Sequence, residues 1–194
     1  MKPVAVLPIK RLDSAKTRLA SALPEPARRK IVLDCFFHTG RVCSQMGFKI
    51  VVLTPDTTIA RLSVEKGWSV FHDDGGGLNR SLKKFLDCYV EKPVLIILPD
   101  LPLLSRRSLK TVISLAGEGT SVICPDIRLD GTNMIYLTRV RGFTPMYGRR
   151  SFHKHLSQLR EAKIYFAIDT GLDLDRPEDL ALLSSLSTSP SRNQ

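Results

Sequence analysis

The sequence lacks any apolar run long enough to cross a membrane. Its longest runs, Val94–Leu98 and Ile50–Leu53, fall far short of the roughly 20 residues that a spanning helix needs. The opening segment Met1–Leu7 carries one lysine and a short apolar stretch without a small-residue cleavage site, so no signal peptide is predicted. We therefore expect a cytoplasmic protein that has no membrane partner.

Common phosphate-binding and cysteine motifs are also missing. There is no G-x-x-x-x-G-K-[ST] and no G-x-G-x-x-G, and the glycine-rich turn at 75–77 lacks the lysine of a P-loop. None of the four cysteines forms a C-x-x-C pair: they are Cys35, Cys43, Cys88 and Cys124. We therefore expect free thiols in a reducing compartment rather than disulfides or a zinc site.

What the chain does have is an excess of positive charge in an otherwise ordinary composition. Lys and Arg number 29 against 19 Asp and Glu, a net charge of +10, which favours a polyanionic partner: a nucleoside triphosphate, a nucleic acid or an anionic lipid. Aromatic residues make up only 7% and no RNA- or DNA-binding motif is present, so a nucleic-acid-binding module is a remote alternative. The length of 194 residues predicts one domain, which we assign to residues 1–185, with a polar tail at 186–194.

Short β-branched runs alternate with longer amphipathic stretches along the chain. The runs predict strands at Val4–Ile9, Lys49–Leu53, Trp68–Phe71, Pro93–Leu98, Ser121–Cys124, Thr132–Tyr136 and Ile164–Ile168. Helices are predicted from Pro24 onward and at Thr57–Lys66, Leu78–Val90, Ser105–Ala116, Ser151–Leu159 and Pro177–Ser185. This alternation is typical of a single α/β domain with a mostly parallel central sheet, in which the most apolar strand, Pro93–Leu98, is central.

A cationic loop follows the first predicted strand. Its four cations within nine residues are Lys10, Arg11, Lys16 and Arg18. Ligands of open α/β sheets bind beyond the carboxyl ends of the strands, where such a loop would surround a triphosphate and neutralise the leaving pyrophosphate. The alternative is a basic loop that only contacts solvent.

Carboxylates form a second candidate site. Asp100 directly follows the predicted central strand, and Asp173 and Asp175 point the same way if the chain there is extended. Three converging carboxylates would repel one another unless a hard cation lay between them, and Mg²⁺ prefers such oxygen ligands. In the alternative reading, Asp173 or Asp175 caps the helix that begins near Pro177, and Asp100 belongs to an exposed turn.

A third candidate site consists of hydrogen-bonding groups. Gly131-Thr132-Asn133 precedes a strand, and Tyr147-Gly148 with Ser151 opens a helix, where backbone N–H groups and a hydroxyl favour an anion. Asn79 also begins a helix and could be only its cap. The histidines give no metal site, because His153 and His155 fall on opposing faces of a predicted helix.

These segments, taken in order, resemble a known family. The stretches that carry the resemblance are 6–19, 77–79, 98–104, 131–133, 147–152 and 173–180. They resemble the 2-phospho-L-lactate guanylyltransferase family of deazaflavin coenzyme F-420 biosynthesis, which includes phosphoenolpyruvate guanylyltransferases. The resemblance implies a Rossmann-like, glycosyltransferase-A-like nucleotidyltransferase fold and transfer of GMP from GTP to 2-phospho-L-lactate or phosphoenolpyruvate, with release of pyrophosphate.

The resemblance also implies roles for individual residues. Asp100, Asp173 and Asp175 would hold Mg²⁺; Lys10, Arg11, Lys16, Arg18 and Asn79 would bind GTP; Thr132, Gly148 and Ser151 would bind the phosphorylated acid. Lys16 and Asp100 are the expected catalytic residues, and the anionic acid would attack directly, without a general base. Arg149 and Arg150 depart from the small residues that are usual there, which leaves the role of Gly148 open. Molybdopterin or a sugar phosphate as acceptor, and a homodimer, also remain open.

Overall fold

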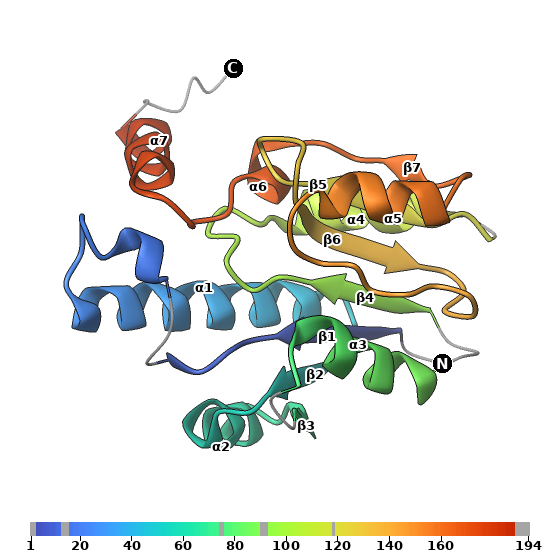
Figure 1. The fold of residues 1–194 in the computed structure, drawn as a ribbon, viewed down its shortest axis with the longest axis horizontal. Coiled ribbons are helices and arrows are strands. Elements are labelled where there is room, and N and C mark those ends of the chain that lie inside the picture. The colour runs from blue at the N-terminus through green and yellow to red at the C-terminus, as the bar shows by residue number, and fades with distance from the viewer. Residues whose placement is uncertain (1–2, 13–15, 74–75, 90–92, 118, 189–194) are drawn as a thin grey trace.

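A computed structural model describes residues 3–12, 16–73, 76–89, 93–117 and 119–188 (Figure 1). The strands are β1 (Val4–Pro8), β2 (Lys49–Thr54), β3 (Ser69–His72), β4 (Val94–Ile97), β5 (Val122–Pro125), β6 (Thr132–Leu137) and β7 (Lys163–Ile164). The α-helices are α1 (Glu25–Gln45), α2 (Thr57–Glu65), α3 (Leu78–Asp87), α4 (Arg106–Ala116), α5 (Ser151–Gln158), α6 (Ile168–Gly171) and α7 (Pro177–Thr188). The 3₁₀ turn η2 (Thr17–Leu19) contains Arg18 of the cationic loop.

The strands form one sheet in the order β3-β2-β1-β4-β6-β5-β7. Strand β6 runs antiparallel to both of its neighbours, and the other pairs are parallel. Val6 of β1 pairs with Val51 on one side and Ile96 on the other, so the carboxyl ends of β2, β1 and β4 lie at the same edge. The predicted mostly parallel α/β sheet, with β4 in its centre, is confirmed.

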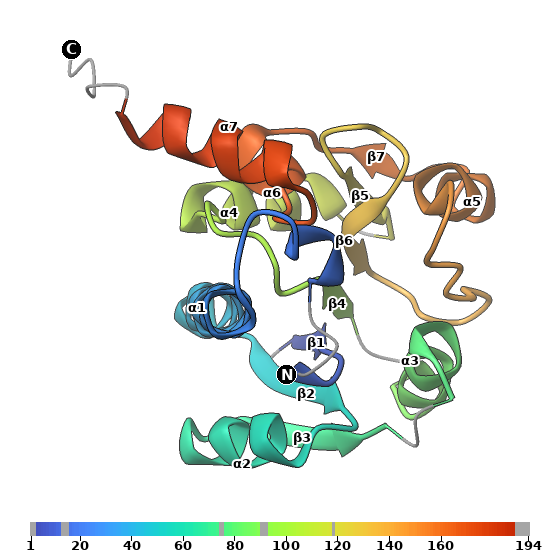
Figure 2. The same ribbon diagram turned by 60° about the vertical axis from the view of Figure 1, so that its left-hand side comes forward.

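Side chains that alternate along the strands build two hydrophobic cores, one on each face of the sheet. In β1, Ala5 and Leu7 belong to the core that includes Phe36 of α1 and Leu109 of α4. Their neighbours Val4 and Val6 belong to the core of α3 and α5, which includes Phe85 and Phe152. Figure 2 shows α1 and α4 on one side of the sheet and α3 and α5 on the other.

The predicted strand Ile164–Ile168 is wrong over most of its length. Strand β7 ends at Ile164, and Ile168 begins the one-turn helix α6. The alternating apolar residues Ile164, Phe166 and Ile168 are 51%, 51% and 44% exposed, so no packing partner extends the strand. The Thr170 hydroxyl instead donates to the Ala167 carbonyl and closes the turn.

The end of the chain and the helix lengths give two further findings. Helix α7 runs to Thr188, beyond the predicted end at Ser185, and residues 189–194 of the expected tail lie outside the described residues. None of the helices in the described ranges combines the length and the apolar character that crossing a membrane requires.

Candidate functional site

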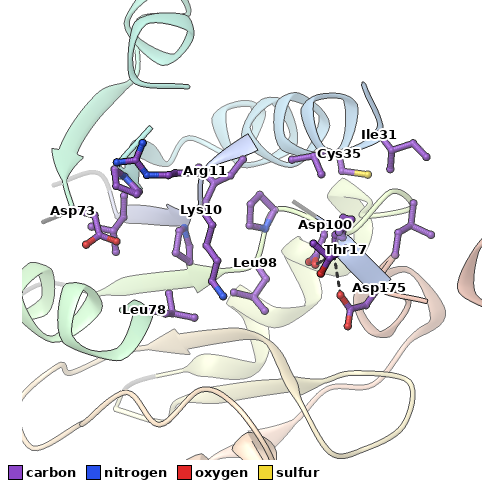
Figure 3. A pocket seen from close by; sticks show the side chains of 18 of the residues that line it. Lys10, Arg11, Thr17, Ile31, Cys35, Asp73, Leu78, Leu98, Asp100 and Asp175 are labelled. Atoms are coloured by element: carbon purple, nitrogen blue, oxygen red, sulfur yellow. Dashed lines mark hydrogen bonds and ion pairs between the residues drawn. The ribbon is translucent and has the colours of Figure 1, made fainter. Parts of the chain in front are cut away.

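A cavity of about 800 Å³ lies at the carboxyl edge of the parallel strands. Its lining includes the residues that leave β1, β2, β3 and β4, namely Lys10 and Arg11, Pro55, Asp73, and Pro99 with Asp100. Figure 3 shows Asp73 and Leu78 at one end of the cavity, Asp100 and Asp175 at the other, and Lys10 between them. The parallel topology explains this assembly, because residues that follow parallel strands meet at one edge of a sheet.

Asp100 and Asp175 come together at one end of the cavity around the Lys16 ammonium. Lys16 Nζ lies 2.5 Å from Asp100 Oδ2 and 3.6 Å from Asp175 Oδ1. The backbone N–H of Leu174 donates to the Asp100 carbonyl at 3.2 Å, which brings the segment 173–176 against the end of β4. The exposed Arg18 guanidinium pairs with the outer oxygen of Asp175.

Two carboxylate oxygens at this end are buried without a hydrogen-bond partner. They are Asp100 Oδ1 and Asp173 Oδ1. Burial, and next the charge of Asp100, raise the pKa of Asp173 to about 7, although the nearby Lys16 charge opposes this. An orphaned buried acceptor is costly, and a further cation would remove that cost.

Lys16 is held in an unusual backbone conformation. Its φ of 53° and ψ of 43° place it in the left-handed region, where a non-glycine residue is strained. The side chain is only 12% exposed, and burial alone would lower its pKa, but the charge and hydrogen bond of Asp100 raise the pKa. The ammonium therefore stays charged and partly neutralises the carboxylates.

The donor set suits a hard cation such as a divalent metal. Among the described residues, no three His, Cys, Asp or Glu side chains already form a metal site, and the Lys16 ammonium lies between Asp100 and Asp175 instead. The buried oxygens of Asp100 and Asp173 that lack a partner are of the type that Mg²⁺ prefers. The residues present therefore fit such an ion.

The acidic segment is held in place by Asp179 and by Asn133, a member of the third candidate site of the sequence analysis. Asp179 Oδ2 accepts the backbone N–H groups of Asp175 at 2.9 Å and Arg176 at 2.7 Å, and its Oδ1 accepts Arg128 Nη2 at 2.6 Å. At the other end, the buried Asn133 amide donates to the Thr170 and Gly171 carbonyls. Asp179 lies in the first turn of α7.

The electrostatics of Asp179 agree with this holding role. Burial would raise its pKa, but the hydrogen bonds from Arg128 and from the backbone of Arg176 and Asp175 outweigh burial and lower the pKa. Asp179 therefore remains an anion, and both of its carboxylate oxygens accept hydrogen bonds.

The cations of the loop extend from the acidic end of the cavity, where Lys16 and Arg18 lie, to its middle, where Lys10 lies. Four exposed residues of this segment line the cavity: Lys10, Arg11, Thr17 and Arg18. Just beyond Arg11, the Leu12 backbone N–H donates to Asp56 Oδ2 at 3.0 Å, and the other oxygen of Asp56 caps α2. The geometry thus places cations where a chain of phosphates could lie.

A smaller cavity of about 410 Å³ adjoins the first, and Lys10, Gly77 and Leu78 line both. Gly148 and Tyr147 line only the smaller one. The Asn79 side chain, also at this cavity, accepts the Tyr147 N–H at 2.7 Å and donates to the Tyr147 carbonyl at 3.1 Å. Asn79 therefore fixes the loop that carries Gly148.

Thr132 and Ser151 lie beneath this loop rather than in either cavity lining. Each is 2% exposed. The Thr132 hydroxyl lies 3.0 Å from His155 Nδ1, and His155 Nε2 accepts the Met146 N–H at 2.9 Å. Because Nε2 accepts, Nδ1 carries the proton and donates it to Thr132. Burial, with a smaller effect of Lys154, lowers the pKa of His155 to about 4, so the ring is neutral.

His155 is a residue whose place the sequence analysis missed. The predicted separation of the two histidines is confirmed, since His153 is exposed and His155 is fully buried. Arg150, another non-glycine residue with a positive φ, has a φ of 56° and donates its backbone N–H to Asp130 Oδ2 at 3.2 Å as α5 begins. No sequence signal pointed to a histidine partner for Thr132, 23 residues away.

Comparisons with known proteins agree on the class of enzyme. A family model described as "Guanylyl transferase CofC like" matches residues 3–185. The phosphoenolpyruvate guanylyltransferase of Rubrobacter xylanophilus is 31% identical, with 95% of each chain covered. The 2-phospho-L-lactate guanylyltransferase of Methanocaldococcus infernus is 28% identical, with 90% of this chain and 81% of the relative covered.

Solved structures support the fold. A nucleotidyl transferase from Methanothermobacter superposes with a TM-score of 0.70 at 16% identity, covering 97% of this chain and 99% of the other. A protein named as a nucleotide-diphospho-sugar transferase from Desulfovibrio desulfuricans G20 superposes with a TM-score of 0.79 at 13% identity, covering 98% and 90%. Membership of the nucleotidyltransferase class generally suggests a divalent metal ion. The chain belongs to the CofC-like guanylyltransferase family.

Proposed function

We propose that this protein transfers GMP from GTP to a phosphorylated three-carbon acid, 2-phospho-L-lactate or phosphoenolpyruvate, and releases pyrophosphate. The observation that carries the proposal is the large cavity, which joins Lys16 and the Asp100 carboxylate, with its unpaired Oδ1, at one end to Lys10 in its middle. One relative is named for 2-phospho-L-lactate and another for phosphoenolpyruvate, and each aligns with most of this chain. The two acids differ little in size and charge, so either suits the same site.

Asp100, Asp173 and Asp175 are the proposed ligands of Mg²⁺. Bound there, the ion would supply charge neutralisation at the transferring phosphate. Lys16 would give up its contact with Asp100 or share it, and its ammonium would then lie next to the triphosphate. The raised pKa of Lys16 supports this role, because the side chain stays charged at neutral pH.

The cationic loop is the proposed binding site of the GTP phosphates. Lys10, Arg11 and Arg18 are exposed at the cavity, where their charges can approach phosphate oxygens. The nucleophile is a phosphate oxygen of the acid, which is already anionic, so the reaction needs orientation and charge neutralisation rather than a general base.

The acceptor is proposed to bind in the smaller cavity. Lys10 lines both cavities and could contact the acid and the triphosphate together. Of the residues proposed for the acid, Gly148 lines this cavity, while Thr132 and Ser151 would act through the loop that they support. The described cysteines are free thiols, three of them buried, which supports a reducing cytoplasm as the setting. A homodimer stays a prediction.

Pyrophosphate release from GTP tests the proposal. The assay supplies 2-phospho-L-lactate, phosphoenolpyruvate, a sugar phosphate or molybdopterin with Mg²⁺, and mass analysis identifies the product. We expect a guanosine diphosphate ester of a three-carbon acid. Turnover with only the sugar phosphate or molybdopterin would replace the proposed acceptor, and no turnover with any acceptor would contradict nucleotidyl transfer.

A further inference from the structure

The loop of residues 126–131 connects the antiparallel strands β5 and β6 and is built around the carboxylate of Asp126. Asp126 Oδ1 accepts the backbone N–H groups of Arg128 at 3.1 Å and Asp130 at 2.9 Å. Asp126 Oδ2 accepts the N–H of Gly131 at 2.9 Å, and the Asp126 N–H donates to the Gly131 carbonyl at 3.0 Å. Aspartate side chains organise turns by such bonds to nearby backbone, so this carboxylate determines the shape of the loop.

Two local features show that the loop has one specific shape. A Cβ on Gly131 would lie 2.6 Å from Asp126 Oδ2 and 3.2 Å from its Cγ, so the carboxylate can reach the Gly131 N–H only because residue 131 has no side chain. Leu129 has a φ of 57°, in the left-handed region that is costly for a non-glycine residue. The Leu129 N–H donates to the Asp126 carbonyl at 3.0 Å, which helps to hold this conformation.

On one side, the loop contacts the acidic end of the site. Arg128 Nη2 donates to Asp179 Oδ1 at 2.6 Å, and Asp179 Oδ2 accepts the backbone N–H of Asp175 at 2.9 Å. The Ile127 backbone N–H donates to the Gly171 carbonyl at 2.8 Å. The loop therefore holds both flanks of the segment that carries two of the proposed metal ligands.

On its other side, the loop contacts the acceptor end. Asp130 Oδ2 accepts the backbone N–H of Arg150 at 3.2 Å, and the Asp130 carbonyl accepts that of Phe152 at 3.0 Å. These two bonds flank Ser151 and fix the start of α5, directly after the turn that carries Gly148. One loop of six residues thus contacts both ends of the site.

We propose that Asp126 is a positioning residue that sets the geometry of the metal end and of the acceptor end together; this rests on the proposed function. Asp126 lines neither of the two cavities and would touch neither the ion nor the acid. It acts through two connections, Arg128 with Asp179 toward the metal ligands and Asp130 toward α5. Displacement of Asp126 should therefore weaken binding of the metal and of the acid at once, whereas loss of one connection should weaken only one of them.

Two measurements on the full chain separate the two ends. The Mn²⁺ dissociation constant is measured without nucleotide by electron paramagnetic resonance. KM is measured for whichever of 2-phospho-L-lactate and phosphoenolpyruvate turns over, at saturating GTP and Mg²⁺, so that a weaker metal site does not affect it. For Asp126→Ala we expect both constants to rise about three- to tenfold, below the roughly 10- to 100-fold typical of residues that contact metal ligands directly.

Two further variants displace or retain the same carboxylate contacts. Gly131→Ala moves the Asp126 carboxylate without a change of charge, and should raise both constants as Asp126→Ala does. Asp126→Asn keeps an oxygen that can accept two of the three backbone N–H groups, so both constants should rise less than in Asp126→Ala.

Variants of the single connections distinguish position from charge by the sign of their effect. Arg128→Gln removes a cation near the metal ligands, so charge alone would lower the Mn²⁺ dissociation constant. We expect it to rise about threefold, with KM for the acid unchanged. Asp130→Ala removes an anion near the acceptor end, so charge alone would lower KM for the anionic acid. We expect KM to rise by a few-fold, with the Mn²⁺ constant unchanged.

Asp87→Ala is the matched control, because Asp87 is an exposed aspartate at the end of α3 that pairs with Lys83. It should leave both constants unchanged. If Asp126→Ala does not fold, Asp126→Asn and Gly131→Ala decide the question. A change at one end only in these variants, or at neither end, would overturn the inference and leave the proposed function intact. Absence of Mn²⁺ binding to the unchanged protein, or of turnover with either acid, would overturn both.

Discussion

The candidate ligand-binding residues at the two ends of the site differ in how their polar atoms are hydrogen-bonded. At the acidic end, Asp100 and Asp173 each keep a buried oxygen without a hydrogen-bond partner. At the acceptor end, Thr132 is satisfied by His155, and the Asn79 amide is satisfied by both backbone groups of Tyr147. Both sets were singled out from the sequence as ligand-binding residues, yet among the described residues the unpaired buried carboxylate oxygens lie at the acidic end, and the buried atom without a partner at the acceptor end is the neutral Tyr147 hydroxyl.

This difference separates groups that meet a ligand from groups that hold the site in shape. Folding normally pairs buried polar atoms, so an unpaired one at a cavity needs a ligand to explain it. A polar side chain whose atoms are all paired with protein contributes by fixing its neighbours. On this basis Asp100 and Asp173 should affect chemistry directly, whereas Thr132, His155 and Asp179 should act through position.

The largest expected effect belongs to Asp100→Asn. The substitution keeps the size of the side chain but removes a charge that faces Lys16 and the proposed ion. We expect turnover to fall by about a thousandfold and Mn²⁺ binding, followed by electron paramagnetic resonance, to weaken strongly. Asp34→Asn, an exposed change on α1, is the control. Turnover close to that of the unchanged protein would remove Asp100 from the metal site.

A smaller effect is expected of Asp179→Asn. Asp179 touches no ligand in this scheme but orients the backbone at Asp175 and Arg176 and pairs with Arg128. Outer-shell partners of metal ligands typically contribute 10- to 100-fold to metal affinity, so we expect the Mn²⁺ dissociation constant to rise about tenfold. Glu178→Gln, the neighbouring exposed acid, should leave that constant unchanged. A loss of thermal stability with unchanged Mn²⁺ affinity would mean that Asp179 acts only as a helix cap.

Thr132→Val should change activity less still. The variant leaves the Nδ1–H of buried His155 without an acceptor, which costs about 1–3 kcal/mol of stability. We expect KM for the acid to rise by only a few-fold and KM for GTP to stay the same, while Thr132→Ser restores both stability and KM. If KM for the acid rose a hundredfold without loss of stability, Thr132 would contact the acid directly, and the two ends of the site would not differ as described.

The pattern of strands in the sequence predicted much of the fold and the location of the main site. Because β1 and β4 are parallel neighbours, residues that follow them, such as Lys10 and Asp100, meet at one edge. That reasoning needs only the order and direction of strands. It could not find the pairing of Arg128 with Asp179, 51 residues apart, because side-chain partners depend on how loops pack. It also assigned a strand at Ile168, since alternating apolar residues there look like a strand although they face solvent.

The smallest effect at neutral pH, and the most specific test of the acceptor end, comes from His155. Its folded-state pKa of about 4 lies below the usual 6.5, so between these values the unfolded chain binds a proton that the folded protein does not. The free energy of unfolding should therefore fall as pH drops through this window, by up to about 1.4 kcal/mol per pH unit from this group. Denaturant unfolding of His155→Gln should lack this part of the slope, while His153→Gln, the same change at an exposed histidine, should keep it. Equal slopes in all three proteins would mean that His155 is charged in the folded state. Thr132 would then lack the neutral partner that distinguishes this end of the site from the acidic end.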